Sequence, residues 1–143
     1  MVEDIKPGIK HTFRHKISKS LTVPKLLPDS PEFQVMPNVL ATGYMVGLIE
    51  WACIQTINPF LDWPNEQTVG THIKISHLAA TPPGLEVEII VELVGVEGRK
   101  LVFEIEAKDN FDLIGKGVHE RFIIHPEKFN KKAEQKANQL KQL

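Results

Sequence analysis

Two ionisable side chains occupy apolar surroundings, where they could do chemistry. Glu50 lies inside VLATGYMVGLIEWACIQTI (residues 39–57), a run of 19 residues that is almost entirely apolar. A carboxylate there is costly unless it is paired, protonated or used in catalysis. His77 shares the alternation of Ile73 and Ile75 in a predicted strand. Its side chain should therefore point to the same side as theirs, toward the helix or a subunit interface. If a buried helical glutamate and an inward histidine share a pocket, they form a general acid/base couple.

Thr42 and Gly70 complete the set of candidate residues. Thr42 precedes Glu50 by eight positions, which puts it about 80° round a helix and about 12 Å along it. The two side chains could therefore line different parts of one groove. In the structural alternative, Glu50 bonds a backbone group, and Thr42 bonds a carbonyl of its own helix, which is the better interpretation of Thr42 taken alone. Gly70 lies on the predicted strand of His77, where its backbone N–H could face a ligand.

The sequence shows no recognisable metal or cofactor motif. Four further histidines lack the spacing of a zinc site, namely His11, His15, His119 and His125. Cys53 lies in the apolar run without a neighbouring base, which favours an inert buried thiol. The glycines form neither a dinucleotide-binding nor a phosphate-loop pattern. We therefore expect no metal and no cofactor.

The composition is that of a single globular domain spanning residues 1–143. Hydrophobic residues make up 42% and charged residues 24% of the chain. A net charge of −1, from 17 basic and 18 acidic residues, argues against a nucleic-acid surface. The single cysteine excludes an internal disulfide framework. Because MVEDIKPGIKHTF has no charged-then-apolar export pattern, we expect a cytoplasmic protein.

The apolar run 39–57 is long enough to span a membrane. An uncompensated carboxylate at Glu50 would cost about 3 kcal/mol in that position. No cluster of lysine or arginine flanks the run. A helix that is apolar on every side can equally lie inside a globular core, so we predict a buried helix and no membrane contact.

The chain divides into one long helix and about five strands. Alternation predicts a first strand within residues 8–23, and four prolines predict a loop over residues 24–37. Asn38 can cap the long helix, and Asn58-Pro59 should end it. Later strands are predicted at residues 68–80, 85–96, 101–108 and 113–125. Residues 127–143 are predicted to form a short C-terminal helix.

The short turns between the last three strands require antiparallel pairing, since a parallel pairing needs a long crossover. The fold class is therefore α+β. One sheet cannot cover a helix that is apolar on every side unless it curls round the helix or a second subunit covers the rest. The element order fits the hotdog fold, a curved antiparallel sheet around one central helix. We expect a homodimer.

Three segments together resemble one family. They are LPDSPEFQVMPNVLATGYMVGLIEWACI, GTHIKISHLAATPPG and VEGRKLVFEIEAKDNFDLIGKGVHERFIIHPEKFN, which span residues 27–130. They resemble the fluoroacetyl-CoA thioesterase group of hotdog-fold thioesterases. The resemblance implies a homodimer that hydrolyses acyl-CoA thioesters at active sites on the subunit interface.

The resemblance also implies roles for particular residues. Thr42, Glu50 and His77 match the catalytic residues of the family, and Gly70 matches the glycine whose N–H approaches the substrate carbonyl. The roles of Glu50 as nucleophile or as activator of water both remain open. The fluoroacetyl-CoA-specific member has phenylalanine at the position of Met36, while Phe33 is retained. The departure at Met36 favours a general short-chain acyl-CoA thioesterase.

Two other functions fit the same residues. A hotdog hydratase or dehydratase also uses a histidine with a helical acid, and its product would differ at an alkene chromophore. A non-catalytic acyl-CoA-binding module would bind without turnover.

Overall fold

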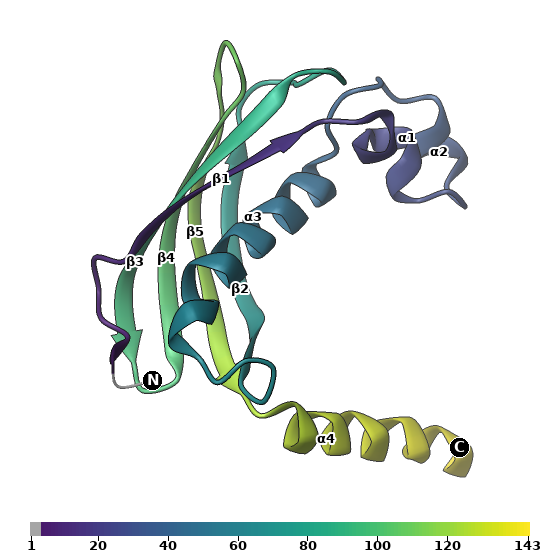
Figure 1. Cartoon of the computed structure of the whole chain (residues 1–143). Coiled ribbons are helices and arrows are strands. Elements are labelled where there is room, and N and C mark those ends of the chain that lie inside the picture. Colours follow the sequence, from purple (N-terminus) through teal and green to yellow (C-terminus); the bar gives the residue numbers. More distant parts are fainter. Residues whose placement is uncertain (1–3) are drawn as a thin grey trace.

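The protein is a five-stranded antiparallel sheet curled round a long helix, α3 (Thr42–Ile57), as Figure 1 shows for the computed structural model, which describes residues 4–143. The strands are β1 (Lys10–Lys16), β2 (Gln67–His77), β3 (Glu86–Glu97), β4 (Lys100–Lys108) and β5 (Leu113–Ile124). Their order in the sheet is β1-β3-β4-β5-β2, so β1 and β2 are the two edges. The α+β arrangement predicted from the sequence is confirmed.

Alternation along β3 and β4 builds the face of the sheet that receives the helix. On β3 the side chains of Val87, Ile89, Val91 and Leu93 are fully buried, and on β4 the same holds for Leu101, Phe103 and Ala107. The intervening glutamates and lysines face outward. Gly98 makes the connecting turn with a φ of 61°, a conformation that glycine adopts without steric cost.

Helix α3 is buried on one side only. Its buried residues are Met45, Leu48, Ile49, Ala52, Cys53, Thr56 and Ile57, whereas Trp51 is 46% exposed on another side. Within residues 4–143, no helix is both long and apolar enough to cross a membrane. The sheet therefore covers part of the apolar surface predicted from the sequence, and the remainder of α3 stays open.

The long helix begins later than predicted, at Thr42 with Ala41 as its N-cap, so the predicted cap at Asn38 is wrong. The reason is tertiary: the N–H of Leu40 bonds Thr81, and the N–H of Ala41 bonds Leu21. Both N–H groups are thus bonded to segments distant in sequence before the helix starts. The helix ends at Ile57, next to the predicted Asn58-Pro59 stop.

The segment predicted as a loop contains two short helices, α1 (Val23–Leu26) and α2 (Pro31–Gln34), which lie beside the start of α3. A proline occupies the first turn of each helix, where its missing N–H costs nothing. Ser30 caps α2, because its hydroxyl accepts from the N–H of Phe33 at 3.1 Å. The first strand is correspondingly shorter than residues 8–23, and a turn at Lys19–Leu21 follows it.

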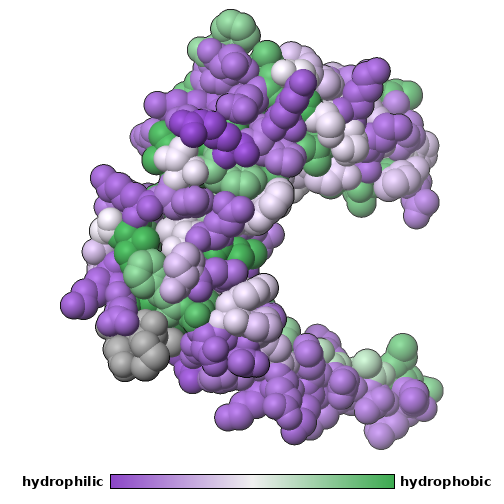
Figure 2. Space-filling view, in the orientation of Figure 1, coloured by the Kyte–Doolittle hydropathy of each residue, from purple (hydrophilic) through white to green (hydrophobic). Residues whose placement is uncertain are grey.

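The C-terminal helix α4 (Pro126–Gln139) starts one residue before the predicted tail of 127–143 and none of its residues is buried. It projects away from the sheet, at the opposite end of the molecule from α1 and α2 (Figure 1). Figure 2 shows the result as a C-shaped outline, with a recess between the region of α1 and α2 and the region of α4.

Candidate active site

Glu50 is held by a buried arginine. On α3 it faces β5, where Arg121 Nη1 donates to Glu50 Oε1 at 3.0 Å. The Arg121 side chain is only 4% exposed, and the Glu50 side chain is 41% exposed. The expectation that Glu50 is buried is therefore wrong, because its side chain is half-exposed, and of the alternatives left open by the sequence the structure shows a paired carboxylate whose partner is the buried group. A buried guanidinium needs such a counter-charge.

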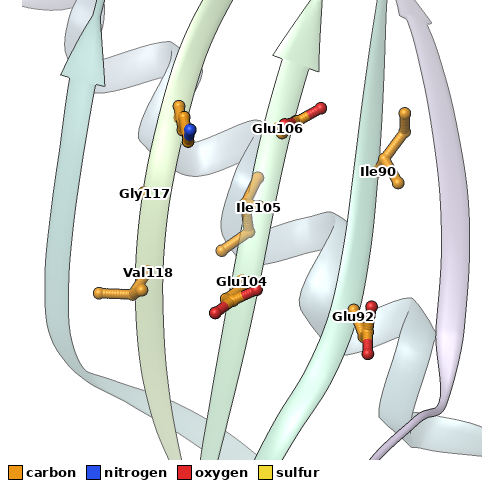
Figure 3. A pocket seen from close by; sticks show the side chains of 8 residues that line it. Ile90, Glu92, Glu104, Ile105, Glu106, Gly117 and Val118 are labelled. Carbon is orange, nitrogen blue, oxygen red and sulfur yellow. The ribbon is translucent and has the colours of Figure 1, made fainter.

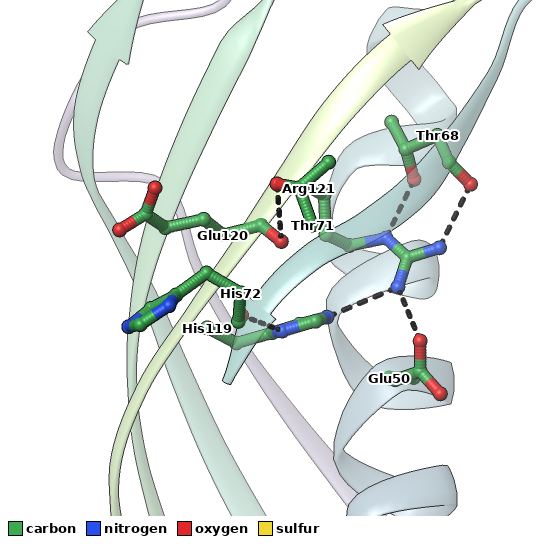
Figure 4. A network of polar contacts seen from close by, with 7 residues as sticks. All are labelled: Glu50, Thr68, Thr71, His72, His119, Glu120 and Arg121. Carbon is green, nitrogen blue, oxygen red and sulfur yellow. Dashed lines mark hydrogen bonds and ion pairs between the residues drawn. The ribbon is translucent and has the colours of Figure 1, made fainter. Parts of the chain in front are cut away.

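Arg121 is fixed in place by further hydrogen bonds (Figure 4). Its Nε donates to the Thr68 hydroxyl at 2.8 Å, and its Nη2 donates to the Thr68 carbonyl at 2.7 Å. Nη1 also contacts His119 Nε2 at 3.0 Å. With the bond to Glu50, four contacts orient a planar group that has five N–H donors. The position of the Glu50 carboxylate is therefore set by the sheet as well as by the helix.

His119 is held as a neutral ring. Its Nδ1 lies 2.8 Å from the carbonyl of His72, and a carbonyl only accepts, so Nδ1 carries the proton. Its Nε2 faces Arg121, which only donates, so Nε2 accepts. Burial lowers the pKa of His119, and the neighbouring Arg121 cation lowers it further, against the opposing hydrogen bond to His72. The neutral state follows from both the contacts and the burial.

Gly70 borders the same carboxylate. A Cβ at this position would lie 2.7 Å from Glu50 Oε1 and 3.1 Å from His119 Cε1. Glycine is therefore the residue that leaves room for Glu50 in this arrangement. A bulge between Gly70 and His72 shifts the alternation of β2, with Thr71 as the extra residue.

Thr42 and His77 form a second polar pair. Thr42, the first residue of α3, lies with its Oγ1 2.8 Å from Nδ1 of His77, the last residue of β2. Thr42 thus bonds neither Glu50 nor its own helix. Burial lowers the pKa of His77, which favours a neutral base. His77 Nε2 is buried without a hydrogen-bond partner among residues 4–143.

The two groups border separate hollows within one chain. The first, of about 440 Å³, is lined by Val46, Glu50, Gly70, Thr71, His72, Ile73 and His119. The second, of about 260 Å³, is lined by Val39, His77, Leu78, Ala79 and Ala80. No hydrogen bond links Glu50 to His77 among the described residues. The fold thus brings Glu50 to Gly70 and Thr42 to His77, but leaves the two pairs apart.

Phe33 and Met36 lie on and just after α2. The N–H of Met36 bonds the Phe33 carbonyl at 3.2 Å, and the Met36 side chain is half-exposed. The neighbouring α1 packs on the start of α3, where Leu26 closely approaches the position of Gly43. This segment therefore adjoins the helix turn that carries Thr42, although neither Phe33 nor Met36 lines the hollows beside Glu50 and His77.

A further hollow, of about 510 Å³, lies on the outer face of the sheet (Figure 3). Its charged lining is Glu92, Glu104, Glu106 and Lys116. It contains no histidine, and its excess of carboxylates would repel the phosphates of a nucleotide-containing ligand. Among the described residues, no cluster of histidine, cysteine and carboxylate side chains is suited to hold a metal ion.

Sequence reasoning missed Arg121, and it weighed His119 only as a metal ligand. A signal was present in the alternation of β5, where His119, Arg121 and Ile123 share one parity and are all buried. Two polar residues at successive inward positions of a strand require an internal partner. That partner, the glutamate of α3, was already known as an anomaly.

Comparisons with known proteins agree on one family. A family model described as fluoroacetyl-CoA-specific thioesterase matches residues 25–127. A fluoroacetyl-CoA thioesterase from Streptantibioticus cattleyicolor is 48% identical over 136 residues, which cover 95% of this chain and 97% of that protein.

Solved structures agree with the sequence comparisons. A fluoroacetyl-CoA thioesterase variant in complex with acetyl-CoA has a TM-score of 0.90 at 48% identity, and the match covers 92% of this chain and 98% of that chain. A hot-dog-like protein from Thermanaerovibrio acidaminovorans has a TM-score of 0.78 at 20% identity over 94% of each chain. The predicted hotdog fold is confirmed.

Proposed function

Because this chain belongs to the fluoroacetyl-CoA-specific thioesterase family, we propose that it hydrolyses short-chain acyl-CoA thioesters to the free acid and CoA. The observation that carries the proposal is the Glu50 carboxylate, fixed by Arg121 at 3.0 Å next to the space that Gly70 leaves open. A thioester carbonyl needs a nucleophile or an activated water, together with a donor for the developing oxyanion.

Glu50 supplies the reacting carboxylate in this proposal. One of its oxygens accepts from Arg121, and the half-exposed side chain borders the hollow. The other oxygen then either takes a proton from an attacking water or attacks the thioester carbonyl itself. Attack by Glu50 breaks the C–S bond, releases the CoA thiolate and forms a mixed anhydride that water then opens. After single turnover in ¹⁸O-water, label in the Glu50 carboxylate would identify this route, because activation of water by Glu50 labels only the free acid.

Gly70, Thr42 and His77 act on the carbonyl and the leaving group. We assign the Gly70 N–H to the developing oxyanion, in keeping with the family match. His77 polarises the carbonyl or returns a proton to the CoA thiolate, and Thr42 orients its ring through the 2.8 Å contact at Nδ1. The buried Nε2 of His77 is then the atom that meets substrate or the partner chain.

The active unit is a homodimer in this proposal. Strand β2 is an edge strand of 11 residues, and such an edge can pair with another chain. Ile73 on this strand and Leu78 directly after it are exposed, and the recess of Figure 2 leaves part of α3 uncovered. Pairing of two β2 strands would cover this surface and could join Glu50 of one chain with His77 of the other. Light scattering should give twice the chain mass of 16.2 kDa.

A panel of acyl-CoA substrates with a thiol assay tests the activity. We expect release of free CoA from acetyl-, propionyl- and butyryl-CoA, and loss of about 100-fold or more in kcat for Glu50→Gln, whose amide oxygen still accepts from Arg121. Glu104→Gln, in the outer hollow, is the matched control and should keep full activity. With an enoyl-CoA added to the panel, loss of its alkene chromophore without thiol release would indicate a hydratase instead, and binding without turnover would indicate a binding module.

We place the protein in the cytoplasm. Cys53 is buried and free, as suits a reducing compartment, and acyl-CoA substrates are available there. Fractionation of the producing cells with an antibody to the protein tests this location.

A further inference from the structure

We propose that His119 is a positioning residue: its neutral ring fixes the Arg121 guanidinium that carries Glu50, and its protonation releases that carboxylate. The proposal rests on the thioesterase function above. It assigns to His119, which is not one of the predicted catalytic residues, control over the position of Glu50 that is lost at acidic pH.

The contacts around His119 leave one arrangement of protons. Nδ1–H donates to the His72 carbonyl at 2.8 Å, and Nε2 accepts from Arg121 Nη1 at 3.0 Å. The same Nη1 donates its second N–H to Glu50 Oε1 at 3.0 Å. The backbone of β2, the ring of His119, the guanidinium and the carboxylate therefore form one continuous chain of hydrogen bonds (Figure 4).

Burial makes the acceptor at His119 hard to replace. His119 is 2% exposed and Arg121 is 3% exposed, so bulk water does not reach the contact between them. A buried N–H that loses its acceptor costs free energy that an exposed one recovers from solvent. Without the His119 ring, the Arg121 guanidinium rotates to find another acceptor for this N–H, and the Glu50 carboxylate that it holds moves with it.

Protonation has a stronger effect than removal of the ring. A protonated His119 would present an N–H and a positive charge at Nε2, directly against an Arg121 N–H and its positive charge. The ring is tethered to His72 and the guanidinium to Thr68, whereas the Glu50 side chain is half-exposed and less restrained. Glu50 is also the anion nearest to the new charge, because it and His119 border the same point beside Gly70. The carboxylate is thus the group that moves.

Of the charged and titratable groups around His119, only Glu50 offsets a positive charge on the ring. The titratable and charged groups that act on it are Arg121 on its own strand, Glu50 on α3 and His72 on β2. Cys53 of α3 adds no anion, since burial raises its pKa to about 12. Burial and the Arg121 cation lower the pKa of His119, so the neutral form persists through neutral pH and is lost only under acidic conditions. Activity should fall as the pH drops through that lowered pKa.

Two substitutions at His119 test the proposal. His119→Gln places an amide oxygen where it can accept from Arg121 and does not titrate, so we expect kcat within about threefold of wild type and an acidic limb that loses this group. His119→Phe removes the acceptor, and we expect kcat to fall about tenfold or more with KM little changed. Unaltered far-ultraviolet circular dichroism excludes misfolding. The proposal is overturned if His119→Gln keeps the wild-type acidic limb, or if folded His119→Phe keeps the wild-type kcat.

Nuclear magnetic resonance tests the same link without turnover. The ¹⁵N shifts of His119 should show a proton on Nδ1 at neutral pH and a titration midpoint below the ordinary value of about 6.5. That midpoint should fall further in Glu50→Gln, which removes the nearest anion. A proton on Nε2, or a midpoint that ignores Glu50, would overturn the proposal. The ¹⁵N shifts report on the link between His119, Arg121 and Glu50 whether or not the protein is a thioesterase. A failure of this proposal can therefore be distinguished from a failure of the proposed function.

Discussion

The polar network around Glu50 and the polar pair of Thr42 and His77 differ in how many hydrogen bonds a single chain provides. Glu50 belongs to a closed network, in which Arg121 is buried and makes four contacts, and His119 uses both ring nitrogens. The other pair consists of Thr42, at the start of α3, and His77, at the end of β2. One hydrogen bond joins them, and His77 Nε2 is buried without a hydrogen-bond partner among residues 4–143. Within one chain, the residues around Glu50 are thus held by several hydrogen bonds, whereas one hydrogen bond joins Thr42 and His77.

The difference has a physical meaning. Buried polar atoms are normally hydrogen-bonded, and under the proposed function we expect the Nε2 of His77 to meet substrate or the partner chain. The network around Glu50 needs no such addition. We therefore expect changes at Arg121 to affect both stability and catalysis, and changes at His77 to affect catalysis alone.

The largest effect is expected at His77. His77→Ala should lower kcat about 100-fold, the scale of losing a general acid or base. The free energy of unfolding should change by no more than about 1 kcal/mol, because only one hydrogen bond disappears. Thiol-release kinetics and chemical denaturation measure the two quantities. His11→Ala is the matched control, since His11 also makes a single side-chain contact, to Gln55 at 3.0 Å. If His77→Ala loses activity only because the protein unfolds, the pair of Thr42 and His77 does not differ from the Glu50 network in this respect.

Arg121→Lys should reduce activity and stability together. Lysine keeps a positive charge but lacks the planar set of donors that joins Thr68, Glu50 and His119. We expect kcat to fall about 30-fold through misplacement of Glu50 and the free energy of unfolding to fall by about 1–3 kcal/mol through unsatisfied buried groups.

The control for Arg121→Lys is Arg14→Lys, on the exposed pair between Arg14 and Glu88 at 2.8 Å. It should cost less than about 1 kcal/mol because solvent screens that pair. Equal losses for the two variants, by thermal denaturation and by kinetics, would contradict the view that the Glu50 network is preorganised.

Gly70→Ala probes the same network by crowding. The new Cβ would lie 2.7 Å from Glu50 Oε1, so the carboxylate must shift, and we expect kcat to fall about tenfold. Gly95→Ala is the control in another strand, where a Cβ would lie 3.3 Å from the side chain of Val102. That change should affect thermal stability without affecting kcat. If Gly70→Ala keeps full activity, Glu50 has more freedom than its contact with Arg121 implies.

Much of this fold could be predicted from the pattern of single strands. Alternation predicted the strand at residues 85–96, which the structure shows as β3 with Val87, Ile89 and Leu93 buried, and the apolar run predicted α3. The start of α3 could not be predicted that way, because the backbone bonds of Leu40 and Ala41 come from segments distant in sequence. Local capping at Asn38 was overridden by these tertiary contacts.

The site was predictable as a set of residues but not as an arrangement. Glu50 and His77 stood out because polar groups at apolar positions are costly. Their partners depend on which strands adjoin α3, and on the bulge at Thr71 that lets both Gly70 and His77 face inward. Arg121 sits on β5, whose place beside β2 follows from the sheet order and from no local motif.

The smallest effect concerns the less complete half of the site. Met36 is half-exposed in the single chain and follows α2, which packs on α1 beside the start of α3, so it can form a wall of the acyl pocket only where substrate or a partner chain closes this region. Methionine is flexible, whereas a phenylalanine ring fills one shape. With Met36 we expect graded preferences among acetyl-, fluoroacetyl-, propionyl- and butyryl-CoA, within about 1–3 kcal/mol. Met36→Phe should sharpen them by a few-fold in kcat/KM. Identical selectivity profiles for the two proteins would show that Met36 is no part of the acyl pocket.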